Sequence, residues 1–532
     1  MAGADDGAWW RDGVLYQCYP RSFADSDGDG VGDLRGIIDH LDHLAWLGID
    51  GLWLNPTFPS PNADWGFDVA DYRGVHPELG TMADLDELIA KADERGMRVL
   101  LDLVPGHTSD EHEWFVAARG DRDAPTRDYY VWRDPRPDGS PPNNWLSVFG
   151  GPAWELDEAS GQYYLHNFVD KQPDLDWWNE NVRDEFDAIL NFWFDRGIAG
   201  FRIDVAHGIV KDRELRDNPA AGEEDHIESR WLGQRPAFSM NRPEVHDVHK
   251  RWRAVCAQRD AEPILLGETW VHDLQELAQF YGDGSDELHL AFNFVFMQAE
   301  LDAATLAPIV ARTEELLPPR AWPVWALGNH DVTRVATRWG RGDERRTRCA
   351  LALLLTLRGT PVLYYGDEIG MTDVDVPVEA MKDPVGLRRH EHKAGRDGAR
   401  TPMAWSSQPS AGFTRSGVEP WLPFGDLTAN VADQREDPGS VLCLCRDLIA
   451  LRRSTPDLRA GAYAQHALDG GVWVYRRGDS VVVALNLADD PGEVEGVHGT
   501  LALSTARERD GEQVTGSLSL GPWEAVVVLD GG

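Results

Sequence analysis

Three acidic residues stand directly after short apolar runs that lie far apart in the chain: Asp204, Glu268 and Asp331. Runs of this length are typical of buried strands, and core packing does not explain charged residues at the ends of several such strands. Glycoside hydrolysis needs one carboxylate at the anomeric carbon of a sugar and one protonated carboxyl group at the leaving oxygen. We therefore predict that these three residues are catalytic and act on a glycosidic bond.

Basic residues beside these carboxyl groups fit the same chemistry. Arg202 lies two residues before Asp204, so both side chains point to the same face of a strand, and the arginine charge favours an ionised Asp204. Glu268 needs a raised pKa to act as an acid near neutrality, which neighbouring carboxylates and a dry pocket supply. Further polar residues at predicted strand ends are Asp102, His107, Asn329 and His330.

Eight strand-like segments alternate with amphipathic, helix-like segments such as 82–95, 183–196 and 345–357. The strand-like segments are 13–20, 49–55, 98–104, 198–205, 264–270, 288–296, 322–327 and 361–366. The alternation predicts the α/β class and a (β/α)8 TIM barrel; a doubly wound sheet also alternates, but eight units of this size favour closure. Such a barrel places its functional groups at the C-terminal ends of the strands, where the carboxyl groups above stand.

Two parts of the chain depart from this alternation. A Trp-, Pro- and Asn-rich stretch follows the third strand and is too long for a loop, so we predict an inserted subdomain (domain B) at 108–175. The barrel (domain A) then takes 1–107 and 176–454. Short alternating strands at 472–475, 480–487 and 525–529 predict a C-terminal antiparallel, β-sandwich-like domain (domain C) at 455–532.

The charge balance narrows the class of partner. With 90 Asp and Glu against 51 Lys and Arg in 532 residues, the formal net charge is −39, and such a surface repels nucleic acid and anionic lipid. We expect a neutral small-molecule substrate, no nucleic-acid partner and no membrane association. No apolar stretch reaches the length of a membrane span, residues 1–12 lack the features of a secretion signal, and five cysteines suggest no disulfide framework. These features indicate a cytoplasmic protein without an organic cofactor.

A second motif, DSDGDGVGD at 25–33, offers ligands for a hard cation. The ligands are the carboxylates of Asp25, Asp27, Asp29 and Asp33 and the backbone carbonyl of Val31. Their spacing is that of the first part of an EF-hand loop, but the twelfth position is Gly36 rather than Glu, so we predict no complete EF-hand. The loop is either a structural Ca²⁺ (or Mg²⁺) site or an empty acidic turn.

Four stretches resemble, in order and spacing, the signature regions of the α-amylase family, glycoside hydrolase family 13: DLVPGHTSD (102–110), GFRIDVAHG (200–208), LLGETW (265–270) and LGNHD (327–331). Three more are similar to motifs of its oligo-1,6-glucosidase and α-glucosidase branch: DWGFDVADY (64–72), QPDLD (172–176) and GRDGARTPMAW (395–405). In this branch the loop at 25–33 holds a structural Ca²⁺ or Mg²⁺. The Asn that helps bind calcium in many α-amylases is Gly106 here, so we expect no second metal site.

The resemblance implies a role for each matching residue. Asp204 matches the family's nucleophile, Glu268 its general acid/base and Asp331 its transition-state stabiliser. The residues that match positions holding the sugar at subsite −1 are His107, Arg202 and His330. These roles imply a covalent glucosyl–Asp204 intermediate and retention of the α-configuration through two inversions.

Other matching positions imply exo-acting cleavage. Asp64 and Arg400 match residues that cap the 4-hydroxyl of a terminal glucose, and we expect them to form a bidentate pair that closes the pocket. Phe67 stands where the family usually has Tyr, so ring stacking is kept but one hydroxyl is lost.

The resemblance implies an exo-acting, retaining α-glucosidase that releases α-D-glucose from the non-reducing end of short α-gluco-oligosaccharides such as maltose or isomaltose. Val205 is the residue type associated with α-1,6 preference, whereas QPDLD differs from the QPDLN usual in oligo-1,6-glucosidases, so both α-1,4 and α-1,6 cleavage stay open.

A transglucosylase or a sucrose or trehalose isomerase would use the same catalytic residues. The loops around 208–245 and 370–395 decide between these activities. A non-catalytic relative, like the heavy chains of amino-acid transporters, is disfavoured because all three carboxyl groups are present.

Overall fold

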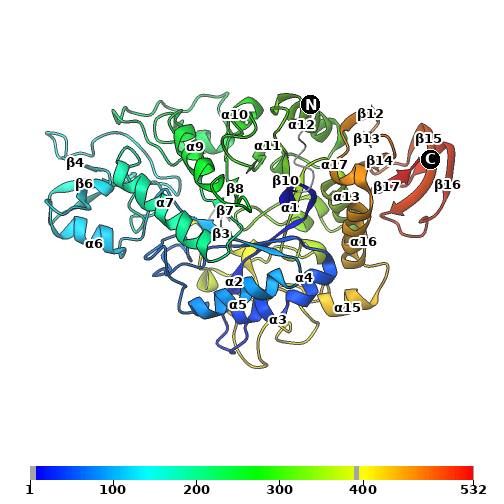
Figure 1. Ribbon diagram of the computed structural model, residues 1–532, viewed down its shortest axis with the longest axis horizontal. Helices are drawn as coiled ribbons and strands as arrows, with labels where there is room; N and C mark the ends of the chain where they lie inside the picture. The colour runs from blue at the N-terminus through cyan, green and yellow to red at the C-terminus, as the bar shows by residue number, and fades with distance from the viewer. Residues whose placement is uncertain (1–7, 389–394, 531–532) are drawn as a thin grey trace.

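The computed structural model describes residues 8–388 and 395–530 (Figure 1). Its central strands are β1 (Leu15–Cys18), β2 (Gly51–Leu54), β3 (Arg98–Leu103), β7 (Gly200–Ile203), β8 (Ile264–Gly267), β9 (Leu290–Ala291), β10 (Val324–Ala326) and β11 (Thr360–Tyr364). They form one parallel sheet in the order β10-β11-β1-β2-β3-β7-β8-β9, and a parallel bridge between Phe292 and Val324 joins its two edges. The predicted TIM-barrel fold is therefore confirmed.

Burial explains why these strands read as continuous apolar runs. Every residue of the barrel strands is buried except Arg98 at the start of β3. The predicted strand at 288–296 is largely wrong, because β9 has two residues and helix α11 (Phe294–Met297) follows it. The side chain of Asn293 accepts a hydrogen bond from the Phe296 N–H and so starts this helix inside the apolar run.

Helices cover the outside of the barrel. The segments predicted as helical correspond to α5 (Met82–Asp93), α7 (Glu180–Asp195) and α13 (Glu344–Thr356). The other helices of this part are α1 (Trp9–Asp12), α2 (Pro20–Phe23), α3 (Leu34–Asp39), α4 (Leu41–Leu47), α8 (Ile227–Leu232), α9 (Val245–Cys256), α10 (Leu274–Gln279), α12 (Ala303–Leu316), α14 (Pro384–Arg388), α15 (Val431–Glu436), α16 (Val441–Ser454) and α17 (Pro456–Ala460). None of the helices in the described parts of the chain combines the length and the apolar character that a membrane span requires.

Two smaller antiparallel sheets lie at opposite ends of the molecule (Figure 1). The insert after β3 contains α6 (Glu113–Gly120) and a sheet of β4 (Trp132–Arg133), β6 (Gln162–Leu165) and β5 (Trp154–Asp157), in that order. The C-terminal sheet has the order β12-β13-β14-β17-β15-β16. Its strands are β12 (Tyr463–Asp469), β13 (Val472–Arg477), β14 (Val481–Asn486), β15 (Gly492–Ser504), β16 (Gln513–Leu520) and β17 (Glu524–Leu529).

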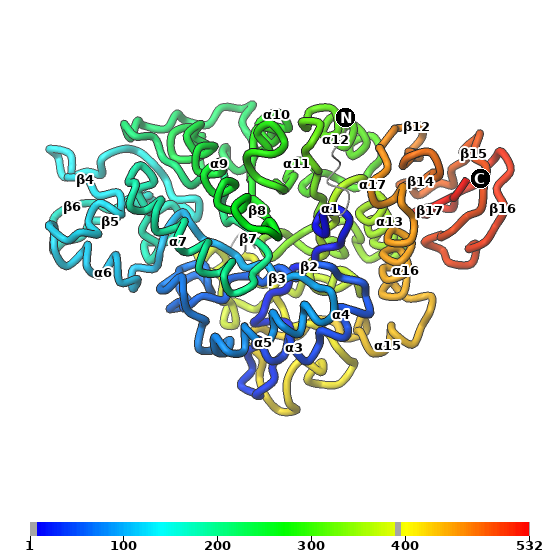
Figure 2. The backbone as a smooth tube through the Cα atoms, viewed as in Figure 1, coloured from blue at the N-terminus to red at the C-terminus, as the bar shows by residue number. Residues whose placement is uncertain are grey.

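The acidic loop at 25–33 is held by a segment that is distant in sequence. Figure 2 shows the yellow chain after residue 400 alongside the blue N-terminal part. The Asp25 N–H donates to the Phe413 carbonyl at 2.8 Å, and the Trp421 N–H donates to the Gly30 carbonyl at 2.9 Å. The two segments therefore fix the backbone of the loop.

Candidate active site

A cavity of about 1020 Å³ opens at the C-terminal ends of the barrel strands. Seven of the nine residues predicted to be catalytic or sugar-binding line it: Asp64, Phe67, His107, Asp204, Glu268, His330 and Asp331. The other two, Arg202 and Arg400, lie behind its wall and are fully buried. The structure thus brings the predicted set together around one cavity.

Arg202 joins three carboxyl groups from three neighbouring strands. Its Nη1 lies 2.7 Å from both Asp102 Oδ1 and Asp204 Oδ1, and its Nη2 lies 2.7 Å from Glu268 Oε2. Asp102 and Arg202 are register partners on β3 and β7, so the pleat of the sheet places their side chains on one face. A buried guanidinium with several carboxylate partners is held in one orientation, and it holds those partners in turn.

The two oxygens of Glu268 have different surroundings. Oε2 faces Arg202 and also accepts a hydrogen bond from the Val205 N–H at 2.9 Å. A guanidinium charge and a backbone donor beside one oxygen favour negative charge there, so a proton on Glu268 sits on Oε1. Val205 has a φ of 43°, which is unusual for a β-branched residue and stores roughly 1–3 kcal/mol of strain. The strained turn after Asp204 is thus the one that aims a backbone donor at Glu268.

Burial and shared charge separate the protonation states of this group. Burial raises the pKa of Glu268 to about 8, although Arg202 opposes the shift, and the Asp204 and Asp331 charges add to it. Burial also raises the pKa of Asp204 to about 7, again against the attraction of Arg202. Because the pKa of Glu268 is the higher of the two, Glu268 keeps a proton at pH values where Asp204 is already ionised. One carboxylate and one carboxylic acid then face the same cavity.

Asp331 is kept ionised by two arginines. Burial disfavours its charge, but the positive charges of Arg396 and Arg400 hold the pKa of Asp331 well below its usual range. Its Oδ1 accepts from Arg396 Nη1 at 3.0 Å and from Arg400 Nη2 at 2.8 Å. Burial lowers the pKa of His330 well below its usual value, so the imidazole is neutral. Asp331 therefore supplies a fixed negative charge at the cavity wall.

The predicted pair between Asp64 and Arg400 is wrong, because the arginine that binds Asp64 is Arg396. Arg396 Nη2 lies 2.9 Å from Asp64 Oδ1, and the same guanidinium contacts Asp331 at 3.0 Å and Asp383 at 2.7 Å. Arg400 lies deeper: its Nε donates to the His330 carbonyl at 2.8 Å. Arg400 is the last residue of the 3-10 helix Asp397–Arg400 and Arg396 directly precedes this helix, and of the two only Arg396 lines the cavity.

The end of the cavity around Asp64 and Arg396 is called the closed end below. Several of its residues were not predicted from the sequence, although two of them stand in motifs already recognised. Arg396 belongs to GRDGARTPMAW, and Gln172 begins QPDLD. Gln172 Nε2 lies 3.2 Å from Asp64 Oδ2 and 3.1 Å from His107 Nε2. Asp383 carried no signal, because only the fold brings it to Arg396.

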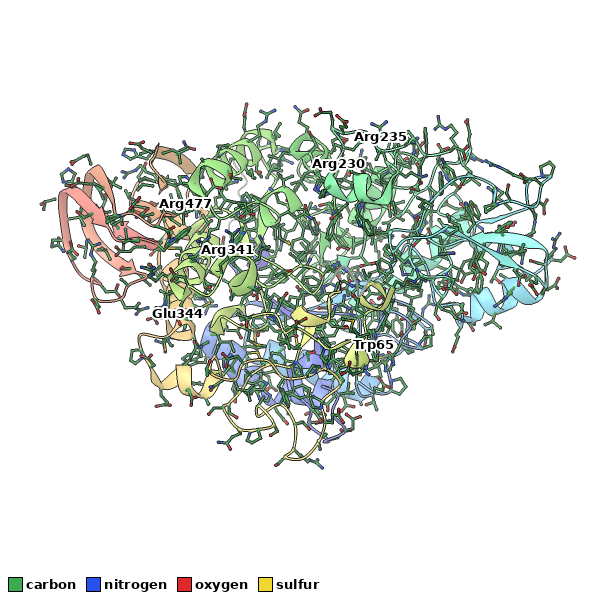
Figure 3. The ribbon with its side chains drawn as sticks, turned by 180° about the vertical axis from the view of Figure 1, so that it is seen from behind. Trp65, Arg230, Arg235, Arg341, Glu344 and Arg477 are labelled. Carbon is green, nitrogen blue, oxygen red and sulfur yellow. The ribbon has the colours of Figure 1, made fainter. Side chains whose placement is uncertain are left out.

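Aromatic rings complete the floor and one side of the cavity. Phe67 stacks on His330 with ring centroids 5.1 Å apart and planes within 3°. Its carbonyl accepts a hydrogen bond from His107 Nε2 at 2.9 Å, which fixes both residues. Trp65 donates from Nε1 to the Lys382 carbonyl at 2.8 Å and so ties this loop to the yellow segment around Lys382 (Figure 3). The stacked pair gives an apolar surface beside the charged groups, as a pyranose ring requires.

The acidic loop brings only part of its predicted ligand set together. Carboxylate oxygens of Asp25, Asp27 and Asp29 all lie within 4.8 Å of one another, which suits a shared cation. Asp33 does not belong to this group of carboxylates: its Oδ1 accepts from the Gly36 N–H at 2.6 Å and its Oδ2 accepts from Ser26, while Asp25 keeps its place in the group although its oxygens accept from the Gly28 and Gly30 N–H groups. Asp33 thus caps α3, and three carboxylates form the candidate metal site.

Comparisons with known proteins agree with this geometry. The family described as alpha amylase, catalytic domain, matches residues 17–461. A probable alpha-glucosidase of Rhizobium meliloti (strain 1021) is 40% identical over 507 residues, which is 92% of this chain and 91% of that protein. An oligo-1,6-glucosidase of Heyndrickxia coagulans is 38% identical over 529 residues, covering 91% of this chain and 92% of that protein. The crystal structure of the alpha-glucosyl transfer enzyme XgtA is 40% identical with a TM-score of 0.91, covering 99% of this chain and 100% of that chain.

The pKa values predict a narrow bell-shaped pH profile. Below about pH 7 Asp204 gains a proton and loses the charge that the predicted nucleophile needs, and above about pH 8 Glu268 loses the proton that the predicted acid would give to the leaving group. We expect kcat/KM for maltose to be highest between these values and to fall on both sides. A 4-nitrophenyl glucoside serves as control: its leaving group needs little protonation, so the basic limb should flatten. An equally steep basic limb for both substrates would contradict the assignment of the acid.

Arg396 is expected to matter for substrate binding, because its planar guanidinium contacts three carboxylates at once. Arg396→Lys keeps the positive charge but has a single nitrogen in place of the guanidinium. The loss of charged hydrogen bonds, worth about 1.5–3 kcal/mol, should lower kcat/KM for maltose by roughly tenfold to a hundredfold. The matched control is Arg388→Lys, whose arginine is exposed and lies 3.6 Å from Asp170. Unchanged steady-state kinetics of Arg396→Lys would show that the closed end is not part of the site.

Proposed function

The chain belongs to the α-amylase family, glycoside hydrolase family 13, and on this basis we propose that it is an exo-acting, retaining α-glucosidase. It releases α-D-glucose from the non-reducing end of short α-gluco-oligosaccharides such as maltose and isomaltose, cleaving α-1,4 bonds, α-1,6 bonds or both. Relatives named alpha-glucosidase and oligo-1,6-glucosidase support this substrate class.

The observation that carries the proposal is the guanidinium of Arg202, shared by Asp204 and Glu268. It holds one ionised and one protonated carboxyl group at close range, and close spacing is characteristic of retaining glycosidases. In the first step Asp204 attacks the anomeric carbon while Glu268 gives the proton on Oε1 to the leaving oxygen. In the second step water gives a proton to Glu268 and displaces Asp204, so the configuration is inverted twice and retained.

Asp331 and His330 serve the same steps from the side of the sugar ring. The fixed charge of Asp331 opposes the positive charge that develops as the ring approaches an oxocarbenium ion. The two side chains also offer hydrogen bonds to the 2- and 3-hydroxyls. Phe67, stacked on His330, gives the ring an apolar face.

The closed end supports exo-acting cleavage. Asp64, Arg396 and Gln172 form a connected polar group, and all three side chains can bind the 4-hydroxyl of a terminal glucose. A longer chain would have to pass through this group, whose arginine is already bound by three carboxylates. Only the non-reducing end of a substrate therefore fits.

The alternative is transfer of the glucosyl group to a sugar, as in a transglucosylase or a sucrose or trehalose isomerase. One structural relative is the isomaltulose synthase of Klebsiella sp. LX3, which is 32% identical with a TM-score of 0.90. The catalytic residues are the same in both activities, and the acceptor that reaches the glucosyl–Asp204 ester makes the difference. Product analysis at high sugar concentration separates them.

The loop at 25–33 is proposed to bind a structural Ca²⁺ or Mg²⁺ through Asp25, Asp27 and Asp29, with the Val31 carbonyl as a further ligand. Its role would be stability, because the bound ion would neutralise three clustered carboxylates beneath the segment at 413–421. Asp33 would contribute by capping α3 and holding the turn.

The central test is glucose release by the wild type and by Asp204→Asn. We expect the wild type to release one glucose at a time from maltose, isomaltose or both, and Asp204→Asn to lose at least about 10³-fold in kcat, as removal of a nucleophile does. Chromatography of early products from a maltoheptaose substrate distinguishes end cleavage from internal cleavage. Early appearance of mid-length products would overturn the exo-acting proposal, and normal turnover by Asp204→Asn would overturn the nucleophile.

The metal proposal predicts a stability change without loss of chemistry. Removing Ca²⁺ with a chelator should lower the melting temperature, since a ligand at a hundred times its Kd adds about 2.7 kcal/mol to the folded state. Asp27→Asn and Asp29→Asn should reduce the response to added Ca²⁺, whereas Asp469→Asn, on the exposed strand β12, should not. A melting temperature that is independent of Ca²⁺ and Mg²⁺ would mean that the loop is an empty acidic turn.

A further inference from the structure

Two histidines and a glutamate meet at the mouth of the cavity. His226 and Glu228 lie at the start of α8, in the segment after β7, and His272 lies in the loop after β8. All three line the cavity, and their side chains are 29%, 48% and 27% exposed, so an ion can reach them from solvent. Their nitrogen and carboxylate oxygen atoms lie within 4.8 Å of one another. Two separate loops of the barrel therefore build one candidate metal site.

The separations within this cluster suit a small divalent ion. Glu228 Oε2 lies 3.8 Å from His226 Nδ1 and 3.5 Å from His272 Nε2. Ligand atoms on a tetrahedral zinc ion, each about 2.0–2.1 Å from the metal, are about 3.3–3.4 Å apart. Small side-chain movements therefore bring both pairs to this geometry. His226 Nδ1 also accepts a long hydrogen bond of 3.4 Å from the Glu228 N–H, which a metal ion would replace.

The two imidazole rings are arranged as neutral rings would be. Their centroids are 3.4 Å apart and their planes differ by 12°, so the rings are stacked. Two positively charged rings would repel each other at this distance. Burial also lowers the pKa of His226, which favours its neutral form. A neutral imidazole keeps the nitrogen lone pair that a metal ion binds.

The carboxylate of the cluster is held in place by a neighbouring tryptophan. Trp270 Nε1 donates to Glu228 Oε2 at 2.9 Å, and the Trp270 ring stacks on Phe294 with centroids 4.2 Å apart. A hydrogen bond of this kind orients a carboxylate ligand before the metal binds. Because Trp270 follows Glu268 by two residues, the cluster is also tied to the C-terminal end of β8.

The charge around the cluster attracts cations. Four carboxyl groups of these two segments line the cavity: Asp225, Glu228, Asp273 and Glu276. Arg230 and Arg235 belong to the green segment around α8 and oppose this charge only in part (Figure 3). With a net charge of −39 for the whole chain, the mouth favours a divalent cation.

We propose that His226, Glu228 and His272 bind a divalent ion of the zinc type, and that the bound ion hinders the entry of longer substrates. Imidazole nitrogen suits Zn²⁺, whereas Ca²⁺ and Mg²⁺ prefer oxygen ligands, so this site differs in its chemistry from the loop at 25–33. Three protein ligands leave one position of a tetrahedral zinc ion for water.

The expected effect on substrates follows from the place of the ligands. Because all three line the cavity at its mouth, the ion would lie on the way from solvent to the reacting groups and would join the two loops. A longer oligosaccharide extends further toward the mouth than maltose does, so it meets the ion more. Binding of the ion does not depend on the proposed function, whereas its effect on substrate entry rests on it.

Zinc binding is measured directly on the full chain, without substrate. Protein freed of metal by chelation is titrated with Zn²⁺ against a zinc-selective chromophoric chelator, in excess Ca²⁺ so that the loop at 25–33 does not compete. We expect one zinc ion per chain. His226→Gln and His272→Gln each lose a ligand and should weaken binding by at least about tenfold. His466→Gln is the matched control, because His466 is exposed on β12, and its zinc affinity should equal that of the wild type.

A further variant tests the orientation of Glu228. Trp270→Phe removes the N–H that Glu228 accepts but keeps a ring that can stack on Phe294. We expect it to weaken zinc binding by roughly tenfold to a hundredfold, as loss of a hydrogen bond to a metal ligand does. The melting temperature of each variant without zinc shows whether it is folded.

The effect on entry is measured with maltose and maltotetraose. Zn²⁺ should raise KM for maltotetraose by about fivefold or more and KM for maltose by less, with kcat little changed, because hindered binding raises KM alone. In His226→Gln and His272→Gln the same zinc concentration should leave both KM values at those of the metal-free variant. Mg²⁺ in place of Zn²⁺ should have no such effect on the wild type.

The outcomes separate this inference from the proposed function. Absence of zinc binding, or equal zinc affinity of the wild type, His226→Gln and His272→Gln, would overturn the site. Zinc binding at these residues with unchanged KM for maltotetraose would overturn the effect on entry. If the chain hydrolysed no α-glucoside, the proposed function and the effect on entry would fall together, while zinc binding by the wild type and its loss in the variants would still support the site.

Discussion

The active site depends on one buried cation. The Arg202 guanidinium, 0% exposed, binds carboxyl groups of Asp102, Asp204 and Glu268. A charge left alone at this depth would cost several kcal/mol, so neither the arginine nor the acids could occupy the dry end of the barrel without the other. The four residues lie on β3, β7 and β8 or directly after them, and these strands are neighbours in the sheet. The ion pairs of Arg202 that set the protonation states therefore also link the ends of the three strands.

In Glu268 and in Asp204, one carboxyl oxygen is bound by Arg202 and the other takes no part in this ion pair. Glu268 uses Oε2 for Arg202 and the Val205 N–H, which leaves Oε1 to carry a proton. Asp204 uses Oδ1 for Arg202, which leaves Oδ2 as the oxygen with which the proposed nucleophile would attack. The left-handed backbone at Val205, directly after the proposed nucleophile, points the Val205 N–H at Glu268, and its strain is the energetic cost of this arrangement.

Local pattern was enough to predict the barrel and seven residues that line its cavity, since buried parallel strands must be apolar and polar residues follow them at the same end of the barrel. It failed at 288–296, where a capping residue, Asn293, turns an apolar run into a helix that pattern alone cannot distinguish from a strand. It also chose the wrong arginine for Asp64. Arg396 and Arg400 are four residues apart, and only the three-dimensional path of the short helix Asp397–Arg400 shows which one reaches the cavity. Asp383 shows the limit most plainly, because it lies 13 residues before Arg396 and no helical or strand spacing relates the two.

The two halves of the cavity are built by different parts of the chain. The proposed catalytic residues could therefore serve either hydrolysis or glucosyl transfer. The closed half is built from strand ends and the loops directly after them, where Arg202, Arg396 and Arg400 pair with carboxylates and leave little freedom. The open half is built from the insert and the long segment after β7, which contribute Val148, Trp231 and Met240. The barrel does not constrain those segments in the same way, so their side chains can change without disturbing the buried charges. For the proposed glucosyl ester, we therefore expect the open half to select the acceptor and the closed half to set the chemistry.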